Sequence, residues 1–158
     1  MKNILITGGA GFIGSNLIKS LIEKGFNVTS LDNYSTGSKS NEIQDVKYYN
    51  LDIEKISKIN ESIDLCFHLA AQSLVLESYN DPLDTFSTNA LGTANILEAL
   101  RRLHHECTAI MITSDKCYDN VEWTYGYRET DRLGGKDPYS GSKGAAELVI
   151  RSYVESFF

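Results

Sequence analysis

The sequence lacks several features that mark particular classes of protein. It has no apolar run of about 18 residues, the length that a membrane-spanning helix needs, so we expect no membrane span. Basic residues are scarce, with 15 Lys and Arg against 21 Asp and Glu, and the formal net charge of −6 argues against non-specific binding to nucleic acid. The first residues run straight into an apolar strand pattern without the layout of a signal peptide.

Cysteine is scarce as well. Cys66, Cys107 and Cys117 are too far apart in the sequence for a Cys-x-x-Cys metal site, and we predict no metal. Their odd number, together with the missing secretory signal, predicts a reducing, cytoplasmic location. Apolar residues at 42% and charged residues at 23% are ordinary for a globular protein, and we expect residues 1–158 to form one domain.

Short apolar runs alternate with stretches of helical periodicity along the chain. Such alternation is typical of parallel βαβ units, which build an α/β, Rossmann-like, doubly wound parallel sheet of about five strands in the order 3-2-1-4-5. A ligand crevice is then expected at the carboxyl ends of the first and fourth strands. The predicted strands are residues 4–6, 26–31, 46–49, 63–69 and 108–113, and the predicted helices are 16–22, 54–61, 84–102 and 139–158.

A glycine-rich turn follows the first predicted strand. Gly8 permits a tight turn, Gly11 allows the backbone to approach a pyrophosphate, and Gly14 allows close packing of helix and sheet. The helix that follows offers N–H groups and a partial positive charge to an anion. The spacing is Gly-x-x-Gly-x-x-Gly, and alone it is weak evidence, since a glycine turn without a ligand is the alternative.

Asp32 favours a dinucleotide site over a glycine turn without a ligand. It lies at the end of the second predicted strand, 18 residues past Gly14, where a carboxylate accepts hydrogen bonds from both ribose hydroxyls of NAD. The same carboxylate repels the 2′-phosphate of NADP. We therefore predict NAD as the cofactor.

At this point the chain resembles the extended short-chain dehydrogenase/reductases that act on nucleotide sugars. The resemblance rests on residues 7–14, Asp32-Asn33, Asp52-Ile53, residues 68–71, Asn89-x-x-Gly92-Thr93 and Tyr139-x-x-x-Lys143. In that family Asp52 and Ile53 flank the adenine, and residues 69–71 line the cofactor. The cofactor-binding residues that the resemblance implies are Gly8, Gly11, Phe12, Ile13, Gly14, Asp32, Asn33, Ser35, Thr36, Gly37, Asp52, Ile53, Leu69, Ala70, Ala71, Asn89, Tyr139 and Lys143.

The second half is more specific, and it is similar to the CDP-glucose 4,6-dehydratases. The residues that carry this similarity are 67–72, 87–89, 113–120, 122–123, 126–129 and 134–140. The resemblance implies a nucleotide-sugar substrate, with CDP-glucose favoured, and a lyase of polysaccharide biosynthesis. The glycine turn is the generic form that epimerases and dTDP-sugar dehydratases share.

Tyr139 and Lys143 lie one helical turn apart, so both project from one helix face. The ammonium of Lys143 favours the phenolate of Tyr139, which can take the proton of the sugar C4 hydroxyl while hydride leaves for NAD. By the resemblance, Lys143 also holds the nicotinamide ribose and Ser114 hydrogen-bonds the C4 hydroxyl. Read as a bare pattern, Tyr-x-x-x-Lys is common on exposed helices.

Asp115 and Lys116 separate a dehydratase from other enzymes of the family. Oxidation at C4 acidifies the C5 hydrogen, and loss of water across C5 and C6 needs a base at C5 and an acid at the C6 hydroxyl. By the resemblance Asp115 is the acid and Lys116 occupies the base position; Lys116 alternatively stabilises the developing enolate. An ordinary solvated turn is the alternative without function.

Three functions stay open on the sequence. Members of the family continue past the Tyr/Lys helix into a C-terminal domain that holds the nucleotide of the substrate, and we expect that domain to be absent from these 158 residues. The chain is then a 4,6-dehydratase or its catalytic half, an NAD-binding module without turnover, or a nucleotide-sugar 4-epimerase. The resemblance implies a homodimer through helices 84–102 and 139–158, with packing inside one chain as the alternative.

Two further features have plainer interpretations. His68 is expected to support the end of the fourth strand rather than take part in chemistry. The aromatic residues between Trp123 and Tyr127 either line a sugar or base pocket or pack within their own loop.

Overall fold

A computed structural model describes residues 2–56 and 62–158. The chain forms two compact units: unit 1 comprises Met1–Ala70 and Asn95–Ile112, and unit 2 comprises Ala71–Ala94 and Thr113–Phe158. No helix in the described part of the chain is long and apolar enough to cross a membrane.

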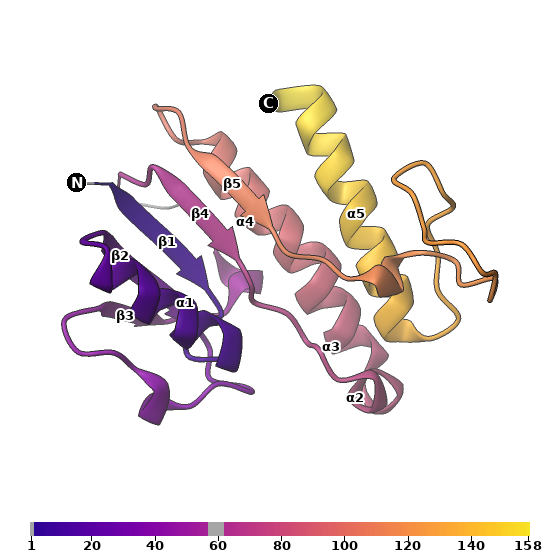
Figure 1. The fold of residues 1–158 in the computed structure, drawn as a ribbon, viewed down its shortest axis with the longest axis horizontal. Helices are drawn as coiled ribbons and strands as arrows, with labels where there is room; N and C mark the ends of the chain where they lie inside the picture. The colour runs from indigo at the N-terminus through magenta and orange to yellow at the C-terminus, as the bar shows by residue number, and fades with distance from the viewer. Residues whose placement is uncertain (1, 57–61) are drawn as a thin grey trace. The chain divides into compact units, whose positions relative to one another are not determined.

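Unit 1 contains a five-stranded parallel sheet in the order β3-β2-β1-β4-β5 (Figure 1). The sheet confirms the predicted doubly wound topology. Its carboxyl ends lie on one edge because every strand runs in the same direction. The strands are β1 (Asn3–Thr7), β2 (Asn27–Asp32), β3 (Lys47–Asn50), β4 (Leu65–His68) and β5 (Thr108–Met111).

Apolar side chains cover both faces of this sheet. Ile4 and Ile6 of β1 pack with Ile18 of α1 (Phe12–Glu23) in one buried cluster. Leu5, which points to the opposite face, belongs to a second cluster with Ile96 of α4 (Gly92–Arg101). The continuous apolar run of β1 is explained by burial on both faces.

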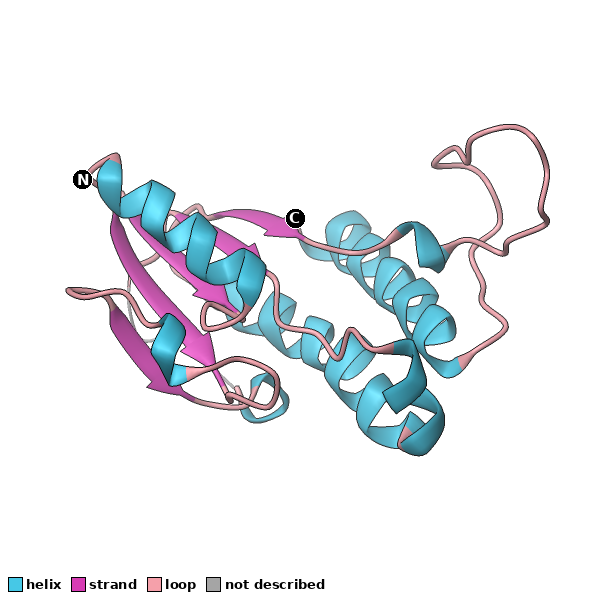
Figure 2. Cartoon of the chain, turned by 60° about the horizontal axis from the view of Figure 1, so that its bottom comes forward, coloured by secondary structure: helices cyan, strands magenta, loops and turns pink. Residues whose placement is uncertain are grey.

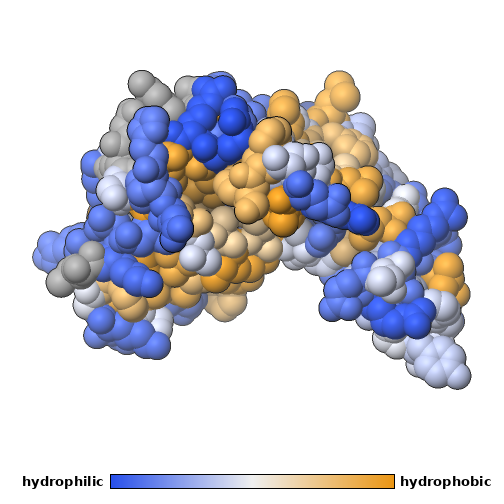
Figure 3. Space-filling model, turned by 90° about the horizontal axis from the view of Figure 1, so that it is seen from above, coloured by the Kyte–Doolittle hydropathy of each residue, from blue (hydrophilic) through white to orange (hydrophobic). Residues whose placement is uncertain are grey.

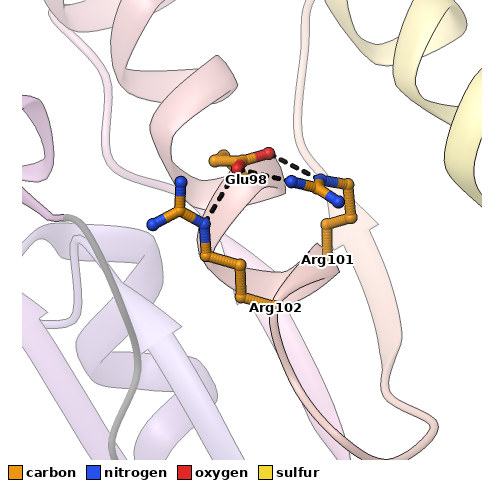
Figure 4. Close-up of polar contacts among 3 residues, drawn as sticks. All are labelled: Glu98, Arg101 and Arg102. Carbon is orange, nitrogen blue, oxygen red and sulfur yellow. Dashed lines mark hydrogen bonds and ion pairs between the residues drawn. The ribbon is translucent and has the colours of Figure 1, made fainter.

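The end of α4 carries an exposed ion-pair cluster. The Glu98 carboxylate accepts hydrogen bonds from Arg101 Nε at 2.7 Å and from Arg102 Nε at 2.9 Å (Figure 4). These hydrogen bonds, the one from Arg101 foremost, lower the pKa of Glu98 to about 2. The cluster is solvated and lies at the end of α4, where the helix dipole also favours cations.

Unit 2 is built from helices and one long loop. Figure 2 shows the loop that joins η4 (Asp115–Cys117) to α5 (Pro138–Phe157). Pro138 occupies the first turn of α5, and Asp137 caps it by accepting a hydrogen bond from Ser140 N at 2.9 Å. The remaining elements are α2 (Val75–Asn80), α3 (Pro82–Phe86) and η3 (Ser87–Leu91), followed by the start of α4.

The structure differs from the sequence prediction in three elements. Residues 84–102 were expected as one helix; the helical backbone runs without a break from α3 into α4, but its middle, η3, is π-helical rather than α-helical. Helix α2 was not predicted, because a helix of six residues is too short to show a recognisable helical period in the sequence. In the predicted helix 54–61 the structure has the 3₁₀ turn η2 (Ile53–Lys55), and residues 57–61 lie outside the described part; a further 3₁₀ turn, η1, spans Lys39–Asn41.

The glycine turn packs so closely that side chains are excluded from it. A Cβ added to Gly14 would lie 2.2 Å from the carbonyl oxygen of Gly8 and 2.6 Å from Gly9 Cα. Gly8 itself has φ +76°, a conformation that glycine adopts without a steric penalty. Helix α1 therefore starts against the backbone of the turn.

Gly14→Ala should lower the free energy of unfolding by about 1–3 kcal/mol, because its methyl group can be accommodated only if backbone atoms move. Urea unfolding followed by circular dichroism measures the change. Gly126→Ala is the matched control, since an added Cβ there meets nothing within 4 Å. Equal stability of the two variants would contradict the close packing described here.

Candidate functional site

The start of α1 presents backbone donors that no side chain caps. The N-cap residue Gly11 makes no side-chain hydrogen bond, and its own N–H donates to the Gly8 carbonyl at 3.2 Å. Phe12 and Ile13 in the first turn are exposed. The first N–H groups of a 12-residue helix are thus available to an anion such as a pyrophosphate.

Asp32 joins this turn to the loop that follows β2. Its Oδ2 accepts a hydrogen bond from Ala10 N at 2.9 Å, and its Oδ1 accepts one from Tyr34 N at 2.8 Å. The side chain is buried at the carboxyl end of β2. Each carboxylate oxygen has further acceptor capacity, which suits a pair of ribose hydroxyls.

The loop after β2 folds onto the glycine turn. Ser35 N donates to Asn33 Oδ1 at 3.0 Å, and Asn33 Nδ2 donates to Asp52 Oδ2 at 3.3 Å. Gly37 lies against Ala10, where an added Cβ would be 3.0 Å from the Ala10 carbonyl carbon. Asn33, Ser35 and Asp52 are therefore hydrogen-bonded to one another, and Gly37 packs against the turn.

Other predicted cofactor residues of unit 1 occupy different environments. Thr36 is exposed in the same loop, whereas Ile53 is buried in the core cluster beneath the sheet. Leu69 N and Ala70 N both donate to Thr7 Oγ1, at 3.2 and 3.1 Å. An added Cβ at Gly8 would lie 2.9 Å from Ala70 N, so the segment after β4 runs directly beside the glycine turn.

Two residues of this region were not foreseen. Thr7 Oγ1 is hydrogen-bonded to His68 Nδ1 at 2.7 Å, which ties the ends of β1 and β4 together and gives His68 the supporting role expected of it. Tyr34 has φ +59° and donates its hydroxyl to Glu42 at 2.7 Å; burial, followed by this hydrogen bond, raises its pKa to about 12. The sequence offered no signal for either role: the partner of Thr7 is 61 residues away, and the hydrogen bond of Tyr34 to Glu42 spans an irregular loop.

In unit 2, Tyr139 and Lys143 lie one turn apart near the start of α5, as predicted. Both are buried, with 9% of Tyr139 and 6% of Lys143 exposed. The structure records no hydrogen bond from a described residue to the Tyr139 hydroxyl or the Lys143 ammonium. Burial lowers the pKa of Lys143, and the charge of Glu147 opposes that shift. Two buried polar groups on one helix face thus keep their capacity to bind a ligand.

The η4 turn packs against α5 within the same unit. Ser114 Oγ caps the turn by accepting from Lys116 N at 3.2 Å, and it donates to Asp115 Oδ1 at 3.1 Å. Asp115 and Lys116 are exposed, whereas Cys117 is buried and its carbonyl oxygen would be 3.3 Å from a Cβ at Gly144. The turn therefore presents its acid and its amine to the outside while Cys117 anchors it.

Asn89 uses its side chain inside unit 2. Its Oδ1 accepts from Gln72 N at 2.9 Å, and its Nδ2 donates to Gln72 O at 2.9 Å and to Ser142 Oγ at 2.8 Å. Ser142 in turn donates to the carbonyl oxygen of Tyr139 at 2.7 Å. Asn89 in η3 thereby connects the segment that follows Ala71 to the start of α5.

The loop between η4 and α5 packs on itself. Tyr118 pairs with Leu133 in an antiparallel bridge that closes the loop. Inside it the rings of Tyr118 and Tyr127 stack at 5.1 Å, and Trp123 lies 5.6 Å from Tyr127. Tyr127 therefore packs within its own loop, which is one of the two interpretations of these aromatic residues. Trp123 also contacts Tyr127 but is 43% exposed. Within the described residues no group of three or more His, Cys, Asp and Glu is arranged to hold a metal ion.

Comparison with known proteins identifies the family. Residues 5–158 match the family described as GDP-mannose 4,6 dehydratase. The chain is 42% identical over 167 aligned positions to CDP-glucose 4,6-dehydratase of Salmonella typhimurium, which covers 99% of this chain and 46% of that protein.

Solved structures of epimerases are similar as well. UDP-glucose 4-epimerase of Thermotoga maritima with UDP-glucose has a TM-score of 0.88 at 30% identity, over 98% of this chain and 52% of that one. The Thermus thermophilus UDP-glucose 4-epimerase complex with NAD has a TM-score of 0.86 at 31% identity, over 98% and 51%.

The chain thus spans about half the length of the curated relatives that it matches. With the match over residues 5–158, the chain belongs to the GDP-mannose 4,6 dehydratase family, within the nucleotide-sugar dehydratase and epimerase group of the short-chain dehydrogenase/reductases.

Proposed function

We propose that the chain is an NAD-dependent nucleotide-sugar 4,6-dehydratase, or the catalytic half of one, and that it converts CDP-glucose to CDP-4-keto-6-deoxyglucose. The observation that carries the proposal is the pair Tyr139 and Lys143, buried on one helix face with polar ends that no described residue uses. The similarity to a CDP-glucose 4,6-dehydratase favours this substrate.

NAD is the proposed cofactor because unit 1 offers the donors and acceptors that it needs. The uncapped N-terminus of α1 suits the pyrophosphate, and the buried carboxylate of Asp32 suits the adenosine ribose. We further assign Asn33, Ser35, Thr36, Gly37, Asp52, Ile53, Leu69, Ala70, Ala71 and Asn89 to the surroundings of the cofactor. When bound, NAD accepts hydride from the sugar C4 and returns it to C6.

Residues of unit 2 handle the protons of the oxidation step. Ser114 holds the C4 hydroxyl by a hydrogen bond, and the phenolate of Tyr139 takes the hydroxyl proton as the C4–H bond breaks. Lys143, as an ammonium, favours that phenolate and binds the nicotinamide ribose. The product of this step is the 4-keto sugar, whose C5 hydrogen is acidic.

Elimination follows at C5 and C6. Lys116 takes the C5 proton as an amine, the C6–O bond breaks, and Asp115 gives its proton to the departing hydroxyl so that water leaves. Lys116 is exposed in this structure, where a bound substrate can reach its side chain. Hydride returned to C6 and a proton at C5 complete the product.

Two other functions have observations in their favour. The uncapped start of α1 and the carboxylate of Asp32 suit a dinucleotide by themselves, which supports an NAD-binding module without turnover. Similar epimerase structures support a 4-epimerase. Incubation with CDP-glucose, dTDP-glucose and UDP-glucose separates the three: a 4-keto-6-deoxy product supports the dehydratase, an inverted C4 centre the epimerase, and NAD binding without any product the module.

Asp32→Asn tests the cofactor assignment. It removes the charge that repels a 2′-phosphate and weakens the acceptor for the ribose, so we expect NAD to bind about tenfold more weakly and the preference for NAD over NADP to fall. Isothermal titration with both dinucleotides measures this. Asp45→Asn, an exposed carboxylate, is the control. An unchanged preference would refute the role of Asp32.

Lys116→Met and Lys116→Arg test the elimination. Methionine removes the amine, and arginine keeps the positive charge but cannot accept a proton. The rate of dehydration should therefore fall at least about 100-fold in both variants, while NAD binding stays the same. Product formation from CDP-glucose is measured, with the exposed Lys136→Met as control. Activity retained by Lys116→Arg alone would assign enolate stabilisation to Lys116 instead.

We also propose a homodimer formed through helices 84–102 and 139–158, in a cytoplasmic enzyme of polysaccharide biosynthesis. Figure 3 shows orange, apolar side chains gathered among blue, polar ones on one face of the protein. Unit 2 exposes large apolar side chains on α3, η3 and α5, among them Leu83, Leu91, Leu148 and Val154. Free cysteines fit the reducing compartment.

Leu148→Glu should turn this dimer into a monomer, because a carboxylate placed within an apolar interface loses its hydration without a partner. Sedimentation velocity measures the mass of each variant. Leu76→Glu, a control on the exposed surface of α2, should leave the mass unchanged. A wild-type chain that sediments as a monomer at all concentrations would refute the proposed dimer.

A further inference from the structure

Glu147 of α5 is a carboxylate that the proposed chemistry does not use. Thr113 Oγ1 donates a hydrogen bond to its Oε1, which connects α5 to the residue directly before the Ser114 turn. Glu147 is partly buried, unlike Glu155 further along the helix, which pairs with Arg151 in solvent. The carboxylate of Glu147 is therefore held in a defined position.

Glu147 lies four residues after Lys143, on the same face of α5. Lys143 is 6% exposed, and burial of this kind drives an ammonium towards the neutral amine. The charge of Glu147 acts in the opposite direction and raises the pKa of Lys143. The two side chains form no direct ion pair, so the ammonium keeps its donors for a ligand.

Other titratable groups surround this part of α5. On α5 itself this group is Tyr139; the elements that pack against α5 carry the others, which are Asp115, Lys116, Cys117 and Tyr118 at η4 and Glu77, Tyr79 and Asp84 on α2 and α3. Among the described residues, Glu147 is the one whose charge acts appreciably on Lys143. The charge of Glu147 also raises the pKa of Cys117 in η4, where burial is the larger cause.

We propose that Glu147, fixed by Thr113, is the counter-charge of the buried Lys143 and thereby a positioning residue of the site in unit 2. A carboxylate one turn away stabilises the ammonium without occupying its hydrogen-bond donors. A direct ion pair would stabilise the charge equally but would compete with any ligand for those donors. The arrangement thus maintains a buried cation that is ready to bind.

Glu147→Gln tests this inference because it keeps an acceptor for Thr113 and removes the charge. The pH titration of Lys143 is followed by the ¹³Cε signal in protein labelled with ¹³C-lysine, and Lys143→Arg assigns the signal. We expect the titration midpoint of Lys143 to fall by about one pH unit. Glu155→Gln, a solvated carboxylate of the same helix, should not move it.

An unchanged midpoint in Glu147→Gln would overturn the proposal, provided that circular dichroism shows the variant folded. If that variant does not fold, Glu147→Asp takes its place: it draws the carboxylate back by one methylene, and a smaller downward shift is expected. A midpoint that stays at the wild-type value in a folded Glu147→Asp would equally overturn it.

The effect of Glu147 on NAD binding rests on the proposed function, and NAD titration tests it separately. If the ammonium binds NAD, wild-type affinity decreases as the pH rises through the pKa of Lys143, and in Glu147→Gln this decrease begins about one unit lower. Absence of NAD binding to the wild-type chain would refute the proposed function and leave the counter-charge intact. A normal pH profile of binding in Glu147→Gln would refute the role of Glu147.

Discussion

The fold of unit 1 depends on a backbone-to-backbone contact that leaves no space for a side chain. The glycine turn lies against the segment after β4, with a Cβ at Gly8 placed 2.9 Å from Ala70 N, and α1 starts against the turn itself. Because bare backbone forms these contacts, the first N–H groups of α1 and the carboxylate of Asp32 are set by the sheet rather than by flexible side chains. The close packing of the backbone thus determines which groups are presented to a ligand.

Apolar periodicity was sufficient to predict the sheet and its order, because buried parallel strands such as residues 4–6 are continuous apolar runs between turns. It could not predict α2 or the π-helical η3. Helix α2 has only six residues, and η3 contains Asn89, whose amide is bound by Gln72 and Ser142 from other parts of the chain. Such segments are determined by tertiary hydrogen bonds, which local propensity does not contain.

The candidate site likewise contains residues that the sequence could predict and residues that it could not. Asp32, Tyr139 and Lys143 carry recognisable spacings, and the structure places Asp32 beside the glycine turn and Tyr139 with Lys143 on one helix face. Thr7 and Glu147 carry no such pattern. Each acquires its role from one partner, His68 or Thr113, that is distant in sequence, so these residues become visible only when the chain is folded.

The loop between η4 and α5 has a consequence for how the chain can change over evolution. Its ends meet at the bridge between Tyr118 and Leu133, and its interior is filled by its own aromatic rings. Such a loop is held by its own contacts, so its length and surface charge can vary while η4 and the first turn of α5, on either side of it, keep their positions. The loop can therefore differ among relatives without a compensating change in α5.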